Sequence, residues 1–249
     1  MAYRYGLVGE KLGHSFSPEI HKDLMKKQNK VGTYELIEIA KDQFSEDFPT
    51  LLKSGYNGLN VTIPYKESVI PFLDELSPEA RYIGAVNTVS FKQGKTLGHN
   101  TDYDGFLTLL SENHIAIKGL TAVVLGSGGV AKAIIKALLD HGISDITVLS
   151  TSKEKFHAFH TISYDFFAGN SVTCDLLINC TPVGMFPNVE KCPIPKHAFR
   201  AKVAIDLIYN PPETLFLKTA RSLGLQTVSG LRMLSAQAEK SQEIWKSNL

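Results

Sequence analysis

Four short polar segments carry side chains that could bind a small molecule. They are residues 13–18 (GHSFSP), 60–66 (NVTIPYK), 87–88 (NT) and 100–102 (NTD). Together they offer hydroxyls, amides, one amine and one carboxylate, a set suited to holding a small polyhydroxylated molecule by hydrogen bonds. Each also has a plain structural explanation, because Ser17 and Pro18 suit an N-cap and the first helical residue, and residues 100–102 could simply begin a helix.

A glycine-rich stretch forms a second candidate site. Gly126, Gly128 and Ala131 make a G-x-G-x-x-A pattern between the apolar run 121–125 and an Ala-rich helical pattern. Small residues at a strand-to-helix junction allow a tight turn and close approach of the backbone to a pyrophosphate. The helix N-terminus adds N–H donors and a positive dipole. In this setting the pattern predicts binding of a dinucleotide.

The segment after the next predicted strand bears on which dinucleotide is bound. An NAD site usually has an acidic residue roughly 20 positions further on, where it binds the ribose 2′-hydroxyl. None is evident at that position in residues 149–155 (LSTSKEK), whose hydroxyls and two lysines could hold a 2′-phosphate. A solvated loop explains the segment almost as well, so NADP is favoured chiefly by the missing acid.

The apolar pattern predicts two α/β halves that position these segments. Alternating strands and helices are typical of a parallel sheet covered by helices. A Gly-containing pair, Gln93 and Gly94, predicts a hairpin over residues 86–98 at the edge of the first sheet. The first half has strands at 5–8, 34–39 and 59–63 and helices near 19–27 and 42–53. The second has strands at 121–125, 145–149, 176–179, 203–206 and 226–228, with helices near 103–113 and 231–245.

Composition narrows the class of protein. The chain has 249 residues, 43% apolar and 20% charged, which disfavours disorder and coiled coil. A net charge of +1 gives no electrostatic argument for nucleic acid or an anionic membrane. The N-terminus lacks a signal-peptide core and no 18-residue apolar run occurs, so we expect a cytoplasmic location. The three cysteines form no C-x-x-C pair and are expected to be reduced thiols, and we expect no metal site.

The motifs resemble those of the shikimate dehydrogenase family along nearly the whole chain. The matching stretches are GHSFSPEIH, NVTIPYK, GAVNT, GHNTDYDGF, GSGGVAKA, INCTPVGM, DLIYNPPETLF and GLRMLSAQA. The resemblance implies an NADP-dependent, reversible reduction of 3-dehydroshikimate to shikimate in aromatic amino acid (chorismate) biosynthesis. It implies an α/β fold with an open N-terminal substrate domain and a Rossmann-type NAD(P)-binding domain, with the cleft between them. Residues 1–102 and 231–249 would form the first domain and residues 103–230 the second.

By the same resemblance, Lys66 and Asp102 flank the reacting carbinol and are the catalytic pair. As hydride reaches a ketone carbon, negative charge grows on the oxygen, and an ammonium can stabilise it and donate a proton. Asp102 would hold Lys66 by a charge-assisted hydrogen bond. For the substrate, the resemblance implies Ser15 and Ser17 at the carboxylate, Asn60, Thr62, Asn87 and Gln237 at ring hydroxyls or neighbouring catalytic groups, and Tyr209 along the cleft.

For the cofactor, the resemblance implies the glycine-rich turn, the segment after the second strand and a nicotinamide-side loop. Many members carry Asn-Arg-Thr where this chain has Ser150, Thr151 and Ser152, and lysine does not replace a planar guanidinium. NAD therefore stays open. The implied residues are Gly126, Ser127, Gly128, Gly129, Val130, Ala131, Ser150, Thr151, Ser152, Lys153, Thr181, Val183, Gly184, Met185, Gly230 and Met233.

Three alternatives stay open. A quinate/shikimate dehydrogenase using NAD or NADP is the nearest, although the Ser-x-Ser pattern ending at Ser17 favours shikimate. A metabolite-sensing homologue without turnover would not need both Lys66 and Asp102. An unrelated Rossmann reductase acting on folate or an acyl group leaves NVTIPYK and NTD unexplained. The expected partner is a small-molecule substrate, with no nucleic acid and no membrane, and the chain is expected to be a monomer or a homodimer.

Overall fold

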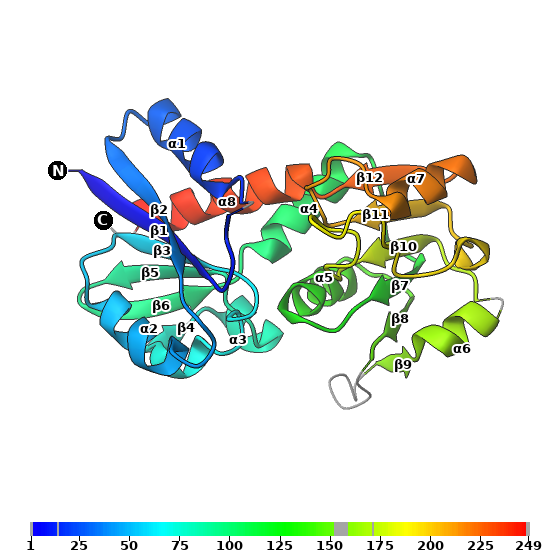
Figure 1. The fold of residues 1–249 in the computed structure, drawn as a ribbon, viewed down its shortest axis with the longest axis horizontal. Coiled ribbons are helices and arrows are strands. Elements are labelled where there is room, and N and C mark those ends of the chain that lie inside the picture. The colour runs from blue at the N-terminus through cyan, green and yellow to red at the C-terminus, as the bar shows by residue number, and fades with distance from the viewer. Residues whose placement is uncertain (1, 14, 152–158, 171, 248–249) are drawn as a thin grey trace. The chain divides into compact units, whose positions relative to one another are not determined.

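The computed structural model describes residues 2–13, 15–151, 159–170 and 172–247 (Figure 1). The chain divides into two compact units, one made of Met1–Gly105 with Ser235–Leu249 and the other of Phe106–Leu234. Each unit contains a six-stranded sheet. Two helices, α4 (Asp102–Glu112) and α8 (Leu231–Ser247), run across the borders between the units. No helix in the described part of the chain is both long and apolar enough to cross a membrane.

The first unit has a mixed sheet with the order β2-β1-β3-β5-β6-β4. β1 pairs in parallel with β2 and β3, and the predicted hairpin β5–β6 joins β3 in antiparallel. The strands are β1 (Tyr3–Gly9), β2 (Gly32–Glu38), β3 (Gly58–Val61), β4 (Glu75–Leu76), β5 (Thr88–Lys92) and β6 (Lys95–His99). The helices are α1 (Ser17–Lys27), α2 (Phe44–Leu52), α3 (Pro78–Ile83) and the short 3-10 helix η1 (Ile70–Phe72).

The sequence predicted that the hairpin would form the edge of this sheet, but that prediction is wrong. β4 pairs with β6 and forms the outer strand, with Leu76 opposite Gly98. The missing side chain at Gly98 makes room for it, because an added Cβ would lie 2.7 Å from Leu73 and 2.8 Å from Leu76 side-chain atoms. A two-residue strand is too short to produce an alternating pattern in the sequence.

The end of α8 packs into the first unit through Trp245. Its ring stacks on Tyr5 of β1 at 4.5 Å between centroids, and its indole N–H donates to the Val89 carbonyl at 3.0 Å. A glycine is required beside it, because a Cβ at Gly58 would lie 2.2 Å from the indole nitrogen. This buried contact fixes the side of α8 that carries the polar residues discussed below.

The second unit has a wholly parallel sheet with the order β12-β11-β10-β7-β8-β9. Its central strands are continuous apolar runs, as expected where both faces of a sheet are covered. The strands are β7 (Thr121–Leu125), β8 (Asp145–Leu149), β9 (His160–Ile162), β10 (Leu176–Asn179), β11 (Val203–Asp206) and β12 (Gln226–Ser229). The helices are α5 (Gly129–Asp140), α6 (Tyr164–Gly169), α7 (Leu215–Ser222) and the 3-10 helix η3 (Lys196–Ala198).

The predicted fold class is confirmed, and the predicted strands of both sheets are present. The sequence did not predict β4, β9, α3, α6 or α7. All five are short, from two to eight residues, so they show few turns of helix or few alternations from which to recognise them.

Candidate functional site

Lys66 and Asp102 form an ion pair in the first unit. The Lys66 Nζ donates to Asp102 Oδ2 at 2.5 Å, and the two side chains are only 14% and 8% exposed. Lys66 follows β3 in a turn, and its carbonyl accepts from the Val86 N–H at 2.7 Å. Asp102 is the first residue of α4, where the helix dipole favours a carboxylate. An amine and a carboxylate are thus fixed in contact, and the Lys66 side chain stays partly exposed.

Asn87 holds the Asp102 end of this pair. Its Nδ2 donates to Asp102 Oδ1 and to Thr101 Oγ1, both at 3.0 Å. Its Oδ1 accepts from the Thr101 N–H at 2.8 Å. Asn87 is 3% exposed, and its polar side-chain atoms form hydrogen bonds with protein groups. Asn87 therefore sets the orientation of the carboxylate.

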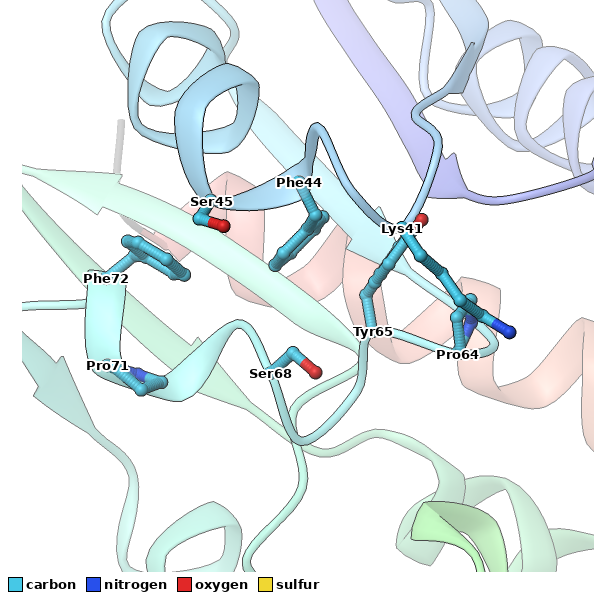
Figure 2. Close-up of a pocket in the computed structure, with 8 residues that line it drawn as sticks. All are labelled: Lys41, Phe44, Ser45, Pro64, Tyr65, Ser68, Pro71 and Phe72. Carbon is cyan, nitrogen blue, oxygen red and sulfur yellow. The ribbon is translucent and has the colours of Figure 1, made fainter.

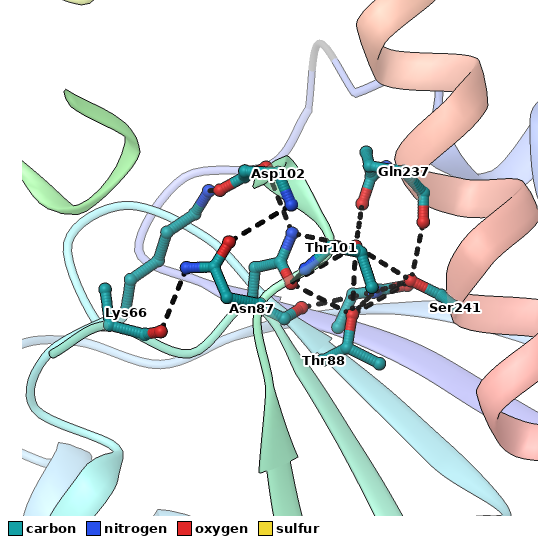
Figure 3. A network of polar contacts seen from close by, with 10 residues as sticks. Lys66, Asn87, Thr88, Thr101, Asp102, Gln237 and Ser241 are labelled. Carbon is teal, nitrogen blue, oxygen red and sulfur yellow. Dashed lines mark hydrogen bonds and ion pairs between the residues drawn. The ribbon is translucent and has the colours of Figure 1, made fainter. Parts of the chain in front are cut away.

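The hydrogen-bonded network continues through buried hydroxyls to α8 (Figure 3). Thr88 Oγ1 lies 2.9 Å from Ser241 Oγ, and Thr101 Oγ1 donates to Gln237 Oε1 at 3.3 Å. Ser241 Oγ donates to the Gln237 carbonyl at 2.9 Å. Figure 3 shows Lys66 and Asp102 at one end of the network and Gln237 and Ser241 at the other. Side chains distant in sequence are thereby linked to the ion pair.

Asn60 belongs to the interior of this network. Its Oδ1 accepts from the Tyr34 hydroxyl at 2.8 Å, and its Nδ2 is within 3.1 Å of the Asn87 carbonyl, Thr88 Oγ1 and Ser241 Oγ. At 4% exposure it has little surface for a ligand. Of the two expectations for Asn60, contact with neighbouring catalytic groups is the one this geometry supports.

Ser15 and Ser17 lie at the start of α1. The Ser17 N–H donates to Ser15 Oγ at 3.2 Å, and Ser17 is buried while Ser15 is half-buried. The predicted N-cap role of Ser17 is wrong in detail. Ser17 is itself the first helical residue, and Phe16 takes the cap position without a cap hydrogen bond from its side chain. The remaining substrate-side residues, Thr62, Gln237 and Tyr209, are half-buried.

A pocket in the first unit is lined in part by Pro64, Tyr65 and Ser68 of the turn that carries Lys66 (Figure 2), and neither Lys66 nor Asp102 is among its lining residues. Phe44 stacks on Tyr65 at 4.0 Å, and the Tyr65 hydroxyl donates to the Ile39 carbonyl at 2.5 Å. Because Tyr65 precedes Lys66, this aromatic packing anchors the turn. The pocket is lined by Lys41, Phe44, Ser45, Pro64, Tyr65, Ser68, Pro71 and Phe72.

In the second unit, the glycine-rich turn joins β7 to α5. Gly126 has φ of +102°, a left-handed conformation that favours glycine, and Gly128 is the N-cap of α5. A Cβ at Gly128 would meet nothing within 4 Å, so the backbone there is open to approach. Ala131 is fully buried. The turn and the N–H groups that begin α5 fit the pyrophosphate of a dinucleotide.

The segment after β8 is described only in part. Ser150 is buried, and its Oγ lies 2.8 Å from Ser127 Oγ, which ties the segment to the glycine-rich turn. Thr151 is exposed. Ser152 and Lys153 lie outside the described residues. The prediction of a 2′-phosphate site therefore stays a prediction.

The nicotinamide-side residues expected from the sequence follow β10 and β12. Thr181 and Val183 are half-buried, Met185 is 39% exposed, and Met233 is buried at the start of α8. Gly184 has φ of +99°, and a Cβ there would lie 2.9 Å from the Lys191 carbonyl oxygen. At Gly230 a Cβ would lie 2.1 Å from the Leu207 carbonyl oxygen. These glycines are needed for close backbone packing at the carboxyl edge of the sheet.

Two fully buried polar residues at this edge were not expected from the sequence. Asn179 ends β10 and Asp206 ends β11, and Asn179 Nδ2 donates to Asp206 Oδ1 at 3.1 Å. Burial raises the pKa of Asp206 to about 6, against the hydrogen bonds from Thr214, Ile208 and Asn179, which lower it. Both residues stand in the INCTPVGM and DLIYNP stretches, but nothing in the pattern distinguishes them from strand-end residues facing solvent.

Thr88 and Thr101 lie in two of the polar segments that the sequence singled out, but neither was assigned a role of its own, and Ser241 was not expected in the site at all. Ser241 is four residues after Gln237, one helical turn further on, which places both on one face of α8. Within the described residues, no cluster of three or more His, Cys, Asp or Glu side chains could hold a metal ion. Cys174, Cys180 and Cys192 form no disulfide with one another.

Fold and side chains together define a two-unit α/β protein. The first unit carries a partly buried Lys–Asp pair, and the second has a doubly wound parallel sheet of the dinucleotide-binding type. Residues 7–89 match the family model for the shikimate dehydrogenase substrate binding domain. The chain is 45% identical over 247 residues to the shikimate dehydrogenase (NADP(+)) of Clostridium perfringens, covering 97% of this chain and 91% of that protein. The chain belongs to the shikimate dehydrogenase family.

Solved structures agree with this assignment. Shikimate dehydrogenase 1 from Peptoclostridium difficile has a TM-score of 0.94 and 41% identity, covering 99% of this chain and 92% of that one. Shikimate 5-dehydrogenase from Thermus thermophilus, in complex with NADP(H) and shikimate, has a TM-score of 0.87 and 30% identity, covering 99% and 94%.

Proposed function

We propose that the chain catalyses the reversible, NADP-dependent reduction of 3-dehydroshikimate to shikimate, an oxidoreductase step acting on a CH–OH group in chorismate biosynthesis. The observation that carries the proposal is the partly buried contact between Lys66 Nζ and Asp102 Oδ2, held by Asn87. The names of the curated relatives, shikimate dehydrogenase (NADP(+)), support it. So does the Thermus thermophilus relative, whose structure contains NADP(H) and shikimate.

In this proposal Lys66 acts at the substrate oxygen. An ammonium there stabilises the negative charge that develops as the carbonyl is reduced, and its N–H can supply the proton. In the oxidation direction the amine takes the proton from the alcohol. Asp102 keeps Nζ in place through a charge-assisted hydrogen bond, and Asn87 keeps Asp102 in place. The pair is therefore positioned before substrate arrives, which lowers the cost of organising the reaction.

The first unit is proposed to bind the substrate and the second the cofactor. Ser15 and Ser17 would hold the substrate carboxylate, and Gln237 would meet a ring hydroxyl. The glycine-rich turn at Gly126 and Gly128 would hold the cofactor pyrophosphate, with the N–H groups that begin α5. When bound, the nicotinamide supplies or accepts the hydride. A cytoplasmic location, and a monomeric or homodimeric state, stay predictions.

The proposal is tested by initial rates of the purified chain on shikimate and on quinate, each with NADP and with NAD. Reduced nicotinamide is followed by its absorbance. We expect the highest kcat/KM with shikimate and NADP. Preference for quinate or for NAD would replace the proposal with a quinate/shikimate dehydrogenase, and no turnover with any of the four pairs would contradict an enzymatic role.

A further inference from the structure

The buried carboxylate of Asp206 has no part in the reaction proposed above. It accepts hydrogen bonds from three different segments of the second unit. Oδ1 accepts from Asn179 Nδ2 and from the Ile208 N–H, both at 3.1 Å, and Oδ2 accepts from Thr214 Oγ1 at 2.6 Å. Thr214 in turn caps α7, because its Oγ1 accepts from the Leu217 N–H. A carboxylate can accept all three bonds at once without needing to donate any.

Asn179 carries this arrangement to the loop that follows β10. Its Oδ1 accepts from the Thr181 N–H at 3.0 Å and from Thr181 Oγ1 at 2.7 Å. Thr181 Oγ1 accepts from the Val183 N–H at 3.2 Å, and Asn179 Nδ2 reaches the Val183 carbonyl at 3.4 Å. Asp206 fixes the Nδ2 side of this amide, so the orientation of the amide determines where the loop backbone lies.

The same loop packs against the glycine-rich turn. A Cβ at Gly126 would lie 2.9 Å from Thr181 Cγ2 and 3.4 Å from the Cys180 carbonyl. On its other side, Phe186 donates its N–H to the Asn210 carbonyl at 3.0 Å, which joins the loop to the segment after β11. With such short contacts on both sides, a shift in the loop would be transmitted to the surfaces where we place the cofactor.

We propose that Asp206 is a positioning residue for the nicotinamide half of the cofactor. It acts through Asn179 on residues 181–185 and through Ile208 and Thr214 on residues 207–214. The inference rests on the proposed function, because the role of these loops in cofactor binding is part of that proposal. The residue touches neither substrate nor cofactor in this scheme.

Stability alone is a poor reason for a carboxylate at this position. Burying a charge is costly, and burial is the largest influence on the Asp206 pKa. Asp175 gives the contrast at the opposite edge of the same sheet. It directly precedes β10 and accepts from the Thr121 N–H at 2.9 Å, Thr121 Oγ1 at 3.1 Å and Lys202 Nζ at 2.8 Å. Lys202 and Thr121 lower its pKa to about 2, so there the charge is favoured.

Asp175 therefore provides a matched control, because it links strands as Asp206 does but contacts no proposed ligand residue. The experiment compares wild type with Asp206→Ala, Asn179→Ala, Asp206→Asn and Asp175→Ala in the full chain. Initial rates of shikimate oxidation give kcat and the KM of each reactant, and calorimetric titration with NADP gives its Kd. Urea unfolding shows which variants are folded.

We expect Asp206→Ala and Asn179→Ala to raise the KM and Kd of NADP about ten- to a hundredfold, the range for loss of a hydrogen bond to a charged group. The KM of shikimate should change less than about twofold in both. Asp206→Asn should restore NADP affinity to within about threefold, because its oxygen can accept from Asn179 and Ile208 and its NH₂ can donate to Thr214. Asp175→Ala should lower the urea midpoint and leave both KM values within about twofold of wild type.

Unchanged NADP affinity in Asn179→Ala and Asp206→Ala would overturn the inference, as would an equal loss in Asp175→Ala. If Asp206→Ala does not fold, Asn179→Ala and Asp206→Asn decide by the same criteria. A wild-type chain that binds NADP in an Asp206-dependent way but does not oxidise shikimate would contradict the proposed function and leave the inference standing. A wild-type chain that does not bind NADP would contradict both.

Discussion

The two units both contain a buried network of polar side chains, but the networks end differently. In the first unit the network of Asn60, Asn87, Thr101 and Ser241 ends on the side chains of Lys66 and Asp102. In the second unit, Asp206 and Asn179 end on backbone N–H groups of the loops that follow β10 and β11. The first network orients reactive side chains, and the second shapes main chain.

This difference follows from what each ligand offers. A ketone and a ring of hydroxyls must be met by specific donors, an acid and a base, which only side chains supply in the required positions. A pyrophosphate and a flat nicotinamide ring can be met by backbone N–H groups, glycines and a helix N-terminus. Substitutions at the end of the first network should therefore affect kcat most, whereas those in the second should affect cofactor affinity and stability.

The largest effect is expected at Lys66. Lys66→Ala removes the charge and proton donor from the end of the first network, and we expect kcat for shikimate oxidation to fall by about 10³-fold, within the usual range for a general acid or base. Lys95→Ala is the matched control, because Lys95 pairs with Glu75 at 2.7 Å, but both side chains are more than half exposed. A Lys66→Ala variant that keeps more than about a tenth of the wild-type kcat would show that the network does not end on the reacting group.

The next effect tests the charge in the second network. The pKa of Asp206 is raised from its ordinary value of 3.8 to about 6, so the native state holds its proton more tightly than the unfolded state does. The stability that this proton contributes is present below pH 3.8 and is lost as the pH rises through about 6. The Asp206→Asn side chain cannot titrate. The free energy of unfolding of this variant, measured relative to that of wild type, should therefore rise by about 3 kcal/mol between pH 4 and pH 7.

Urea unfolding at several pH values measures this difference. One titratable group near Asp206 is the Cys192 thiol. Burial raises its pKa most, a hydrogen bond with the Ile194 backbone lowers it, and Asp206 raises it further, so Cys192 stays neutral across this range. A difference between variant and wild type that is constant with pH would mean that Asp206 is as easily ionised in the folded chain as in the unfolded one. Ionising the carboxylate would then carry no net cost in the folded chain.

The sequence predicted most of the strands and helices that assemble each network within its own unit. Largely apolar runs such as residues 121–125 and 203–206 were recognisable as strands, because parallel strands in a covered sheet are nearly continuous apolar runs. The polar segments at strand ends were recognisable because their residue types are unsuited to a core. The pair formed by Lys66 and Asp102 came from the family resemblance, and the structure brings the two side chains into contact.

The interior of the networks could not be predicted in the same way. Asn60 was expected to face a ligand or a catalytic group, and only the three-dimensional arrangement shows that Tyr34, Thr88 and Ser241 take up its side chain. Asp206 is separated from Asn179 by 27 residues, and their contact depends on β10 and β11 being neighbours. A strand order is a property of the whole sheet, so no local pattern encodes this pairing.

The smallest effect is expected from a hydroxyl in the middle of the first network. Ser241 Oγ contacts Asn60 Nδ2 at 3.0 Å and Thr88 Oγ1 at 2.9 Å. In Ser241→Ala the Asn60 amide keeps two other acceptors, so we expect a loss of about 1 kcal/mol in stability and a fall of a few-fold in kcat. Ser247→Ala is the control on the same helix, because its exposed hydroxyl donates only to the Ile244 carbonyl among the described contacts. Both variants are compared by their urea midpoints and their kcat. Equal effects would mean that the buried Ser241 hydroxyl contributes no more to the network than the exposed Ser247 hydroxyl does. The positioning of Lys66 and Asp102 would then be restricted to Asn87 alone.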